Sequence, residues 1–244
     1  VVELNRPPHN HFNNQMIHQI ANAYEAFDQD PECRVILLAA GGKAFCAGAD
    51  LINAPLTGTF TEGEGAAKHL YKEAARVFRC KKPVVAAVHG SAVGGGLGLA
   101  LSADFRVTCQ EAKFSANFSR LGLHPGFGLS VTLPRLIGHQ KASLLFYTGR
   151  RVPGDEAVAL GLADLLAAQR DVRKTAMTLA EEIAGAAPLA VMSIRETLRR
   201  GLADTVEAAT ERELTEQDWL RGTEDFKEGV ASTNERRTPN FKCR

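Results

Sequence analysis

The stretch 90-GSAVGGGLGLALSADFRV-107 places three consecutive glycines between a short apolar run and a helix-like segment. Gly98 adds a fourth glycine two residues later. A strand that leads through glycines into a helix N-terminus presents unpaired backbone N–H groups at the positive end of the helix dipole. Because glycine has no Cβ atom, such a turn can closely approach an anion or a developing oxyanion. The alternative interpretation is that the glycines only allow helix and strand to pack closely.

Two phosphate-binding patterns can be tested on the glycines of this chain. The G-x-G-x-x-G spacing fails, because its third glycine falls on Leu99 when counted from Gly94 and on Leu101 when counted from Gly96. The Gly-Lys pair at 42–43 lacks the upstream glycine and the following Ser or Thr of a P-loop. Neither nucleotide-binding motif is therefore expected.

Strand-like and helix-like segments alternate around the glycine stretch. Short apolar runs are typical of buried strands, and a helix capped by Asn13 or Asn14 follows the first strand. The alternation predicts an α/β architecture. The expected strands cover residues 1–5, 34–40, 84–89 and 104–109, and further helices cover residues 63–80 and begin at about Gly95.

The C-terminal part of the chain has a different character. From Asp171 onward the strand-like runs stop, and amphipathic helices follow one another. The composition changes near Ala186-Ala187-Pro188. We therefore expect a core over residues 1–186 and a helical region over residues 187–244.

Composition limits the classes of partner. The chain has 244 residues, 45% hydrophobic and 23% charged, which is typical of a globular protein with a sizeable core. Its formal net charge of +1 argues against nucleic acid or an anionic membrane surface as partner. No metal site is expected, because His9, His18 and His139 have neither metal-ligand spacing nor carboxylate neighbours.

The cellular location can be inferred only indirectly. Five scattered cysteines without a C-x-x-C pair predict a reducing compartment. No apolar run reaches the roughly 18 residues of a membrane span, and no signal peptide is visible. We expect a cytoplasmic protein, or one in an organelle matrix if a transit peptide has been removed. The opening VVELNRP resembles a strand already under way, which is compatible with residues missing before Val1.

Six motifs along the chain share one resemblance. They are 6-RPPHNHFN-13, 41-GGKAFCAGADL-51, 83-PVVAAVHGSAVGGGLGLALSADFRV-107, 120-RLGLHPGFGLSVTLPRLIG-138, 149-GRRVPGDEAVALGLAD-164 and 224-EDFKEGVASTNERRTPNF-241. In content and order they resemble the crotonase (enoyl-CoA hydratase/isomerase) superfamily over essentially the whole chain. The resemblance implies a spiral of ββα units, with C-terminal helices over 187–244 that build homotrimers or dimers of trimers. It also implies an acyl-CoA thioester as ligand, with coenzyme A as part of the substrate and no separate cofactor.

The resemblance assigns site residues by position. The backbone N–H groups of Ala49 and Gly95 match the pair that holds the thioester oxygen. Gly95 also begins the expected helix, where the negative charge of a thioester enolate is well stabilised. Further positions line or shape the substrate site by the same resemblance: His11, Phe12, Lys43, Ala44, Phe45, Ala47, Asp50, Gly94, Gly98 and Phe118.

Two of these positions depart from the family pattern. Family hydratases use two glutamates to activate water and to protonate the α-carbon, and their positions fall here on Gly98 and Phe118. Neither residue can transfer a proton. Because general acid–base help is commonly worth 10²–10⁴-fold, we expect ordinary hydratase activity to be severely reduced or absent.

Another residue could supply the acid or base. His124, in the turn 121-LGLHPGFG-128, is the best candidate, since histidine titrates near neutral pH; the alternative is a hydrogen bond within a tight turn. His89 is expected to be a satisfied core histidine. Weaker candidates are Glu62, Glu64 and His69, and Ser115, Asn117, Ser119 and Ser130 could orient a polar group of the substrate.

Two functions from different classes remain open. The first is an enzyme that acts on an acyl-CoA through enolate stabilisation. The second is an acyl-CoA-binding protein or subunit without catalytic activity. The lack of both glutamates favours the second, whereas the oxyanion-type pair at Ala49 and Gly95 favours the first.

Overall fold

The architecture rests on two sheets, seen in a computed structural model that describes residues 1–49 and 70–244. The strands are β1 (Val2–Leu4), β2 (Ile36–Ala40), β3 (Ala44–Cys46), β4 (Val84–Val88), β5 (Ser91–Val93), β6 (Phe105–Thr108), β7 (Lys113–Ser115), β8 (Arg151–Pro153) and β9 (Leu165–Leu166). One sheet has the order β1-β2-β4-β6-β9 and is parallel throughout. The other has the order β3-β5-β7-β8, and only the β7–β8 pair is antiparallel.

Helices separate and cover these strands. They are α1 (Asn14–Gln29), α2 (Leu70–Phe78), α3 (Gly95–Ser102), α4 (Leu129–Ile137), α5 (His139–Thr148), α6 (Gly154–Leu160), α7 (Val172–Ala184), α8 (Pro188–Arg199), α9 (Leu202–Leu220) and α10 (Glu224–Glu235). Two 3-10 helices are η1 (Asn117–Leu121) and η2 (Gln169–Asp171). Asn13 caps α1 as expected, since its side chain accepts a 3.0 Å hydrogen bond from the Met16 N–H. Of the helix predicted over 63–80, the part before Leu70 lies outside the described residues.

A ββα unit repeats along the chain. The pairs β2–β3, β4–β5 and β6–β7 each place their first strand in the five-stranded sheet and their second in the four-stranded sheet. A helix follows each pair, beginning with α2, α3 and η1 in turn. This arrangement confirms the predicted α/β spiral of ββα units. The strands predicted from apolar runs all belong to the five-stranded sheet. The sequence did not predict β3, β5 and β7, because each has only three residues and lies in a segment that looks like a turn.

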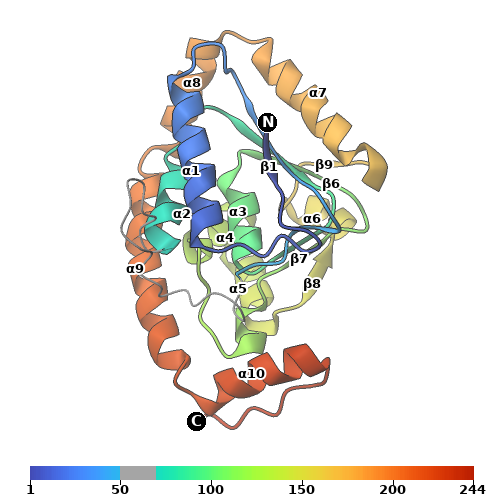
Figure 1. Cartoon of the computed structure of the whole chain (residues 1–244), viewed down its shortest axis with the longest axis vertical. Helices are drawn as coiled ribbons and strands as arrows, with labels where there is room; N and C mark the ends of the chain where they lie inside the picture. The colour runs from blue at the N-terminus through green and yellow to red at the C-terminus, as the bar shows by residue number, and fades with distance from the viewer. Residues whose placement is uncertain (50–69) are drawn as a thin grey trace.

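Helices from both halves of the chain complete the core. α7 packs on β2, β4 and β6, and this cover explains why β4 is buried along its whole length. α9 runs along α2 and also contacts α4, while α10 packs against η1 near the C-terminus (Figure 1). The C-terminal helices are thus integrated with the ββα core of the same chain. The predicted boundary at 186/187 and a role of residues 187–244 in oligomers stay predictions.

None of the described helices is, on its own, long and apolar enough to cross a membrane. One pair, Gln169–Ala184 with Pro188–Arg199, meets the length and composition test jointly but is bent by 106°.

A buried carboxylate joins α9 to the start of α4. Glu213 is 0% exposed, and its carboxylate accepts hydrogen bonds from the backbone N–H groups of Gly128 (2.8 Å) and Ser130 (3.0 Å) and from the Ser130 hydroxyl (2.5 Å). These donors lie at the N-terminus of α4, where an acceptor is needed and a negative charge is favourable. Glu213 therefore fixes the turn that precedes α4.

We predict that Glu213→Ala lowers the free energy of unfolding by about 3 kcal/mol, because it leaves buried donors without an acceptor. Urea denaturation followed by circular dichroism measures this loss. Glu211→Ala, at an exposed position of the same helix, is the matched control and should change stability by less than about 0.5 kcal/mol. Similar losses in the two variants would contradict the capping role.

Candidate active site

The glycine turn is packed so closely that side chains have no room. Gly94 precedes α3 with a φ of +55°, a conformation that favours glycine. A Cβ atom on Gly95 would lie 2.5 Å from Cζ of Phe12, and one on Gly96 would overlap the carbonyl oxygen of Cys46 in β3. The close-packing interpretation of the glycines is therefore correct, and it leaves the helix N-terminus open at the same time.

The two N–H groups that the resemblance pairs lie on adjoining loops. Phe12 and Ala49 form an isolated parallel bridge, and the Phe12 N–H donates to the Gly48 carbonyl at 3.0 Å. A Cβ atom on Gly48 would lie 3.9 Å from the Gly95 nitrogen, so the loops of Ala49 and Gly95 are in contact. Within the described ranges, neither N–H has a hydrogen-bond partner. Both N–H groups are therefore available to donate to a ligand.

A pocket of about 80 Å³ lies at these loops, between α2, α3, η1, α9 and the turn before α4. Its wall is mostly apolar. No described residue of this wall carries a carboxylate, an imidazole or a cationic group. The lining residues are Phe12, Ala47, Gly48, Ala49, Leu70, Tyr71, Val93, Gly94, Gly95, Asn117, Phe118, Leu121, Leu123, Gly126, Phe127 and Gln217.

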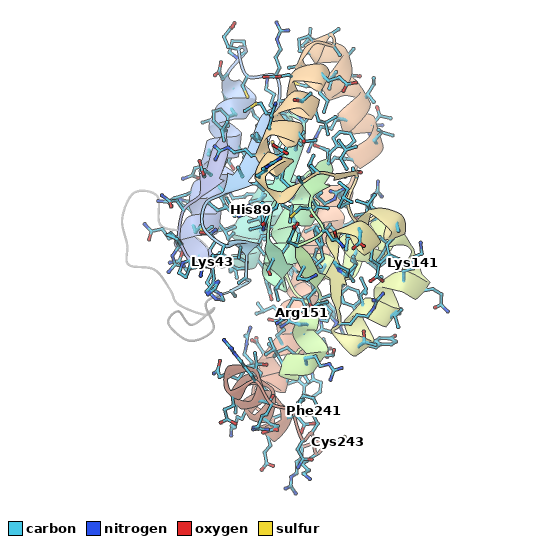
Figure 2. The ribbon with its side chains drawn as sticks, turned by 90° about the vertical axis from the view of Figure 1, so that its right-hand side faces the viewer. Lys43, His89, Lys141, Arg151, Phe241 and Cys243 are labelled. Atoms are coloured by element: carbon cyan, nitrogen blue, oxygen red, sulfur yellow. The ribbon has the colours of Figure 1, made fainter. Side chains whose placement is uncertain are left out.

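The structure brings six of the predicted site residues together. Phe12, Ala47, Ala49, Gly94, Gly95 and Phe118 all line the pocket. Phe45 and Ala44 are instead buried in β3, with Phe45 0% exposed, so they support the wall from behind. His11 and Lys43 are exposed and lie outside the lining, and Lys43 lies close to His89 at one edge of the molecule (Figure 2). Asp50, Glu62, Glu64 and His69 lie outside the described residues.

Comparison with known proteins decides the family. A family model described as enoyl-CoA hydratase/isomerase matches residues 1–244. A probable enoyl-CoA hydratase of Mycobacterium leprae is 34% identical, over 100% of this chain and 94% of that protein. The chain belongs to the enoyl-CoA hydratase/isomerase family. This confirms the resemblance to the crotonase superfamily.

Further relatives include isomerases and solved structures. The peroxisomal Delta(3,5)-Delta(2,4)-dienoyl-CoA isomerase of Arabidopsis thaliana is 30% identical, over 98% of this chain and 90% of that protein. The crystal structure of an enoyl-CoA hydratase/isomerase from Pseudoalteromonas atlantica has a TM-score of 0.87 at 29% identity, over 98% of this chain and 94% of that chain. This family member is accordingly a crotonase-family enzyme by its relatives, with its reaction unassigned.

Aromatic side chains fill the space at both positions where the resemblance places glutamates, Phe127 beside Gly98 and Phe118 itself. A Cβ atom on Gly98 would lie 2.8 Å from Cβ of Phe127, a buried residue whose ring packs 5.4 Å from that of Phe12. Phe118 lies in η1 and is 9% exposed. A Cβ atom on Gly94 would lie 3.7 Å from its Cζ. The space beside Gly98, where the resemblance places one glutamate, is thus filled by Phe127, which sequence patterns did not single out.

A polar pair from distant parts of the chain completes the wall. The hydroxyl of Tyr71 in α2 donates to Oε1 of Gln217 in α9 at 2.7 Å. Burial raises the pKa of the Tyr71 phenol well above its ordinary value, so the hydroxyl stays protonated. Sequence reasoning missed both residues, since Tyr71 has the spacing of a core position and Gln217 stands among charged residues.

The two candidate histidines have local partners. Nδ1 of His124 lies 2.8 Å from the Pro125 carbonyl oxygen, which is the turn hydrogen bond of the alternative interpretation, and its ring is outside the pocket lining. A catalytic role of His124 stays a prediction. His89 is partly exposed rather than a core residue, and its Nε2 lies 3.1 Å from the Gly42 carbonyl oxygen.

The cysteine nearest the glycine turn is inert. Cys46 is 0% exposed, and its thiol donates to the Asn10 carbonyl oxygen at 3.1 Å. Burial raises its pKa to about 12, so no thiolate is present at neutral pH. Cys46 therefore acts as a small core residue and not as a nucleophile.

We predict that Gly98→Ala lowers the free energy of unfolding by about 1–3 kcal/mol, because the added methyl group overpacks the core against Phe127. Gly41→Ala is the matched control, since the nearest atom to its Cβ would lie at 3.8 Å. Thermal and urea unfolding measure both variants. Phe127→Gly removes the opposing Cβ atom, so its loss and that of Gly98→Ala should combine less than additively, and strictly additive losses in the double variant would refute the contact.

Proposed function

We propose that this family member binds an acyl-CoA thioester and stabilises the enolate of its acyl group. The observation that carries the proposal is the pair of N–H groups, of Ala49 and Gly95, which have no hydrogen-bond partner among residues 1–49 and 70–244 and lie at an apolar pocket. A thioester oxygen between them would accept two hydrogen bonds at the N-terminus of α3. Coenzyme A enters as part of the substrate, and we propose no separate cofactor.

The described wall of the pocket limits the chemistry. An oxyanion pair stabilises charge on the thioester oxygen, which is worth about 3–4 kcal/mol per donor in other enzymes. Water activation by two carboxylates has no support, because Gly98 and Phe118 occupy the expected positions. Proton transfer would then depend on neutral groups of the wall, on His124 or on the substrate itself. We therefore propose enolate chemistry other than ordinary hydration of a 2-enoyl-CoA.

The same wall supports a second candidate function. A pocket without a carboxylate or imidazole among its described residues suits an acyl-CoA-binding protein or subunit that does not catalyse a reaction. Binding and turnover must therefore be measured separately.

We predict that the protein binds butyryl-CoA but hydrates crotonyl-CoA at least 10²-fold more slowly than a family hydratase that carries both glutamates. Calorimetry measures binding, and mass spectrometry follows products from 2-enoyl-, 3-enoyl- and 3-oxoacyl-CoA. Efficient hydration of crotonyl-CoA would refute the importance of Gly98 and Phe118. Turnover of another thioester that His124→Ala abolishes would support a catalytic histidine, whereas tight binding without turnover would support the second function.

We also propose assembly into a homotrimer or a dimer of trimers through the C-terminal region. Ile194 and Leu198 lie one turn apart on α8 and are 59% and 68% exposed, which favours a covered surface in an oligomer. We predict that the double variant Ile194→Asp/Leu198→Asp reduces the mass measured by light scattering. Tyr147→Asp, at an exposed aromatic residue of α5, is the control. An unchanged oligomer in the double variant would exclude this face.

A further inference from the structure

The amide group of Gln217 is held in a single orientation. Its Oε1 accepts hydrogen bonds from the Tyr71 hydroxyl at 2.7 Å and from Nη2 of Arg221 at 2.8 Å, and its Nε2 donates to the His124 carbonyl oxygen at 2.8 Å. A guanidinium group can only donate and a carbonyl oxygen can only accept, so the amide cannot be flipped. The side chain is 2% exposed and lines the pocket.

One donor of this amide remains unused. A primary amide carries two hydrogens on nitrogen, and the bond to the His124 carbonyl uses one of them. Among residues 1–49 and 70–244, the second N–H has no partner. A buried donor without an acceptor is unfavourable, and a ligand acceptor would remove that penalty. The second N–H of Gln217 is thus a candidate contact for a ligand.

Because Gly126 has no side chain, the turn before α4 packs directly against this amide. A Cβ atom at Gly126 would lie 2.7 Å from Nε2 of Gln217 and would overlap the hydroxyl of Tyr71. Between Gly126 and the oxyanion pair, the wall consists of aromatic rings in contact. Phe127 follows Gly126 and packs on Phe12, which in turn packs on Gly95. The pocket therefore joins a donor pair and a single donor through an apolar surface.

We propose that Gln217 is a specificity-determining residue that donates its second N–H to an oxygen on the acyl chain. The site would then select oxygenated thioesters, such as 3-oxoacyl- or 3-hydroxyacyl-CoA, over plain acyl-CoA of the same length. This inference rests on the proposed binding of acyl-CoA. A buried amide that is built to donate discriminates against an analogue that lacks the acceptor, because its N–H is then left without a partner.

The test compares acetoacetyl-CoA and 3-hydroxybutyryl-CoA with butyryl-CoA by calorimetry. The unmodified protein should bind at least one oxygenated thioester about tenfold or more tightly than butyryl-CoA. Gln217→Met keeps the length of the side chain and removes the amide, so the preference should disappear while butyryl-CoA affinity stays within about twofold. Arg221→Met is the matched control, since it removes one bond to Oε1 from outside the pocket lining but keeps the N–H, and it should retain most of the preference.

Each outcome separates the claims. Equal affinity of the unmodified protein for all three thioesters would overturn the inference and leave acyl-CoA binding intact, with a water molecule as the partner of Gln217. Equal loss of all three ligands in Gln217→Met would show that Gln217 only joins α9 to α2. Failure of the unmodified protein to bind any thioester would instead overturn the proposed function. The comparison on unmodified protein stays decisive even if Gln217→Met does not fold.

Discussion

The backbone of Gly95 and Gly96 lies against Phe12 and the Cys46 carbonyl with no space for a Cβ atom, and the site is built on this contact. It brings the start of α3 next to β3 and next to the loop that carries Ala49. Two backbone N–H groups thereby lie at one pocket, and both donors belong to the backbone. Backbone N–H groups do not change protonation state and have no rotatable side chain. Their position therefore depends on how the two sheets and α3 pack.

The elements that could be predicted are those with a local cause. β2 and β4 are apolar runs because both faces of their sheet are covered, and Asn13 caps α1 through its own side chain. The three-residue strands of the second sheet have no periodicity to detect, so only the family resemblance implied them. Their pairing depends on contacts between successive ββα units, which no short window of sequence contains.

The residues of the site also divide into those with a local signal in the sequence and those without one. Ala49, Gly94 and Gly95 belong to motifs whose glycines are visible in the sequence. Tyr71 and Gln217 are 146 residues apart, and each has an ordinary sequence context, so only the fold reveals their hydrogen bond. Phe127 was hidden for a related reason: its ring fills space that exists because Gly98 has no side chain. The sequence alone shows that Gly98 departs from the family pattern. The residue whose ring packs into the space beside it, Phe127, lies 29 positions later in the chain.

α9 links the C-terminal region to the pocket through two buried side chains. Glu213 holds the N–H groups at the start of α4, and Gln217 holds the carbonyl of His124 in the same turn. Between these anchors lies Phe127, with a φ of +62° that a non-glycine residue adopts only when its surroundings enforce it. The ring that fills the space beside Gly98 is therefore positioned from α9. Through α9, residues 187–244 therefore help to shape the pocket of the ββα core.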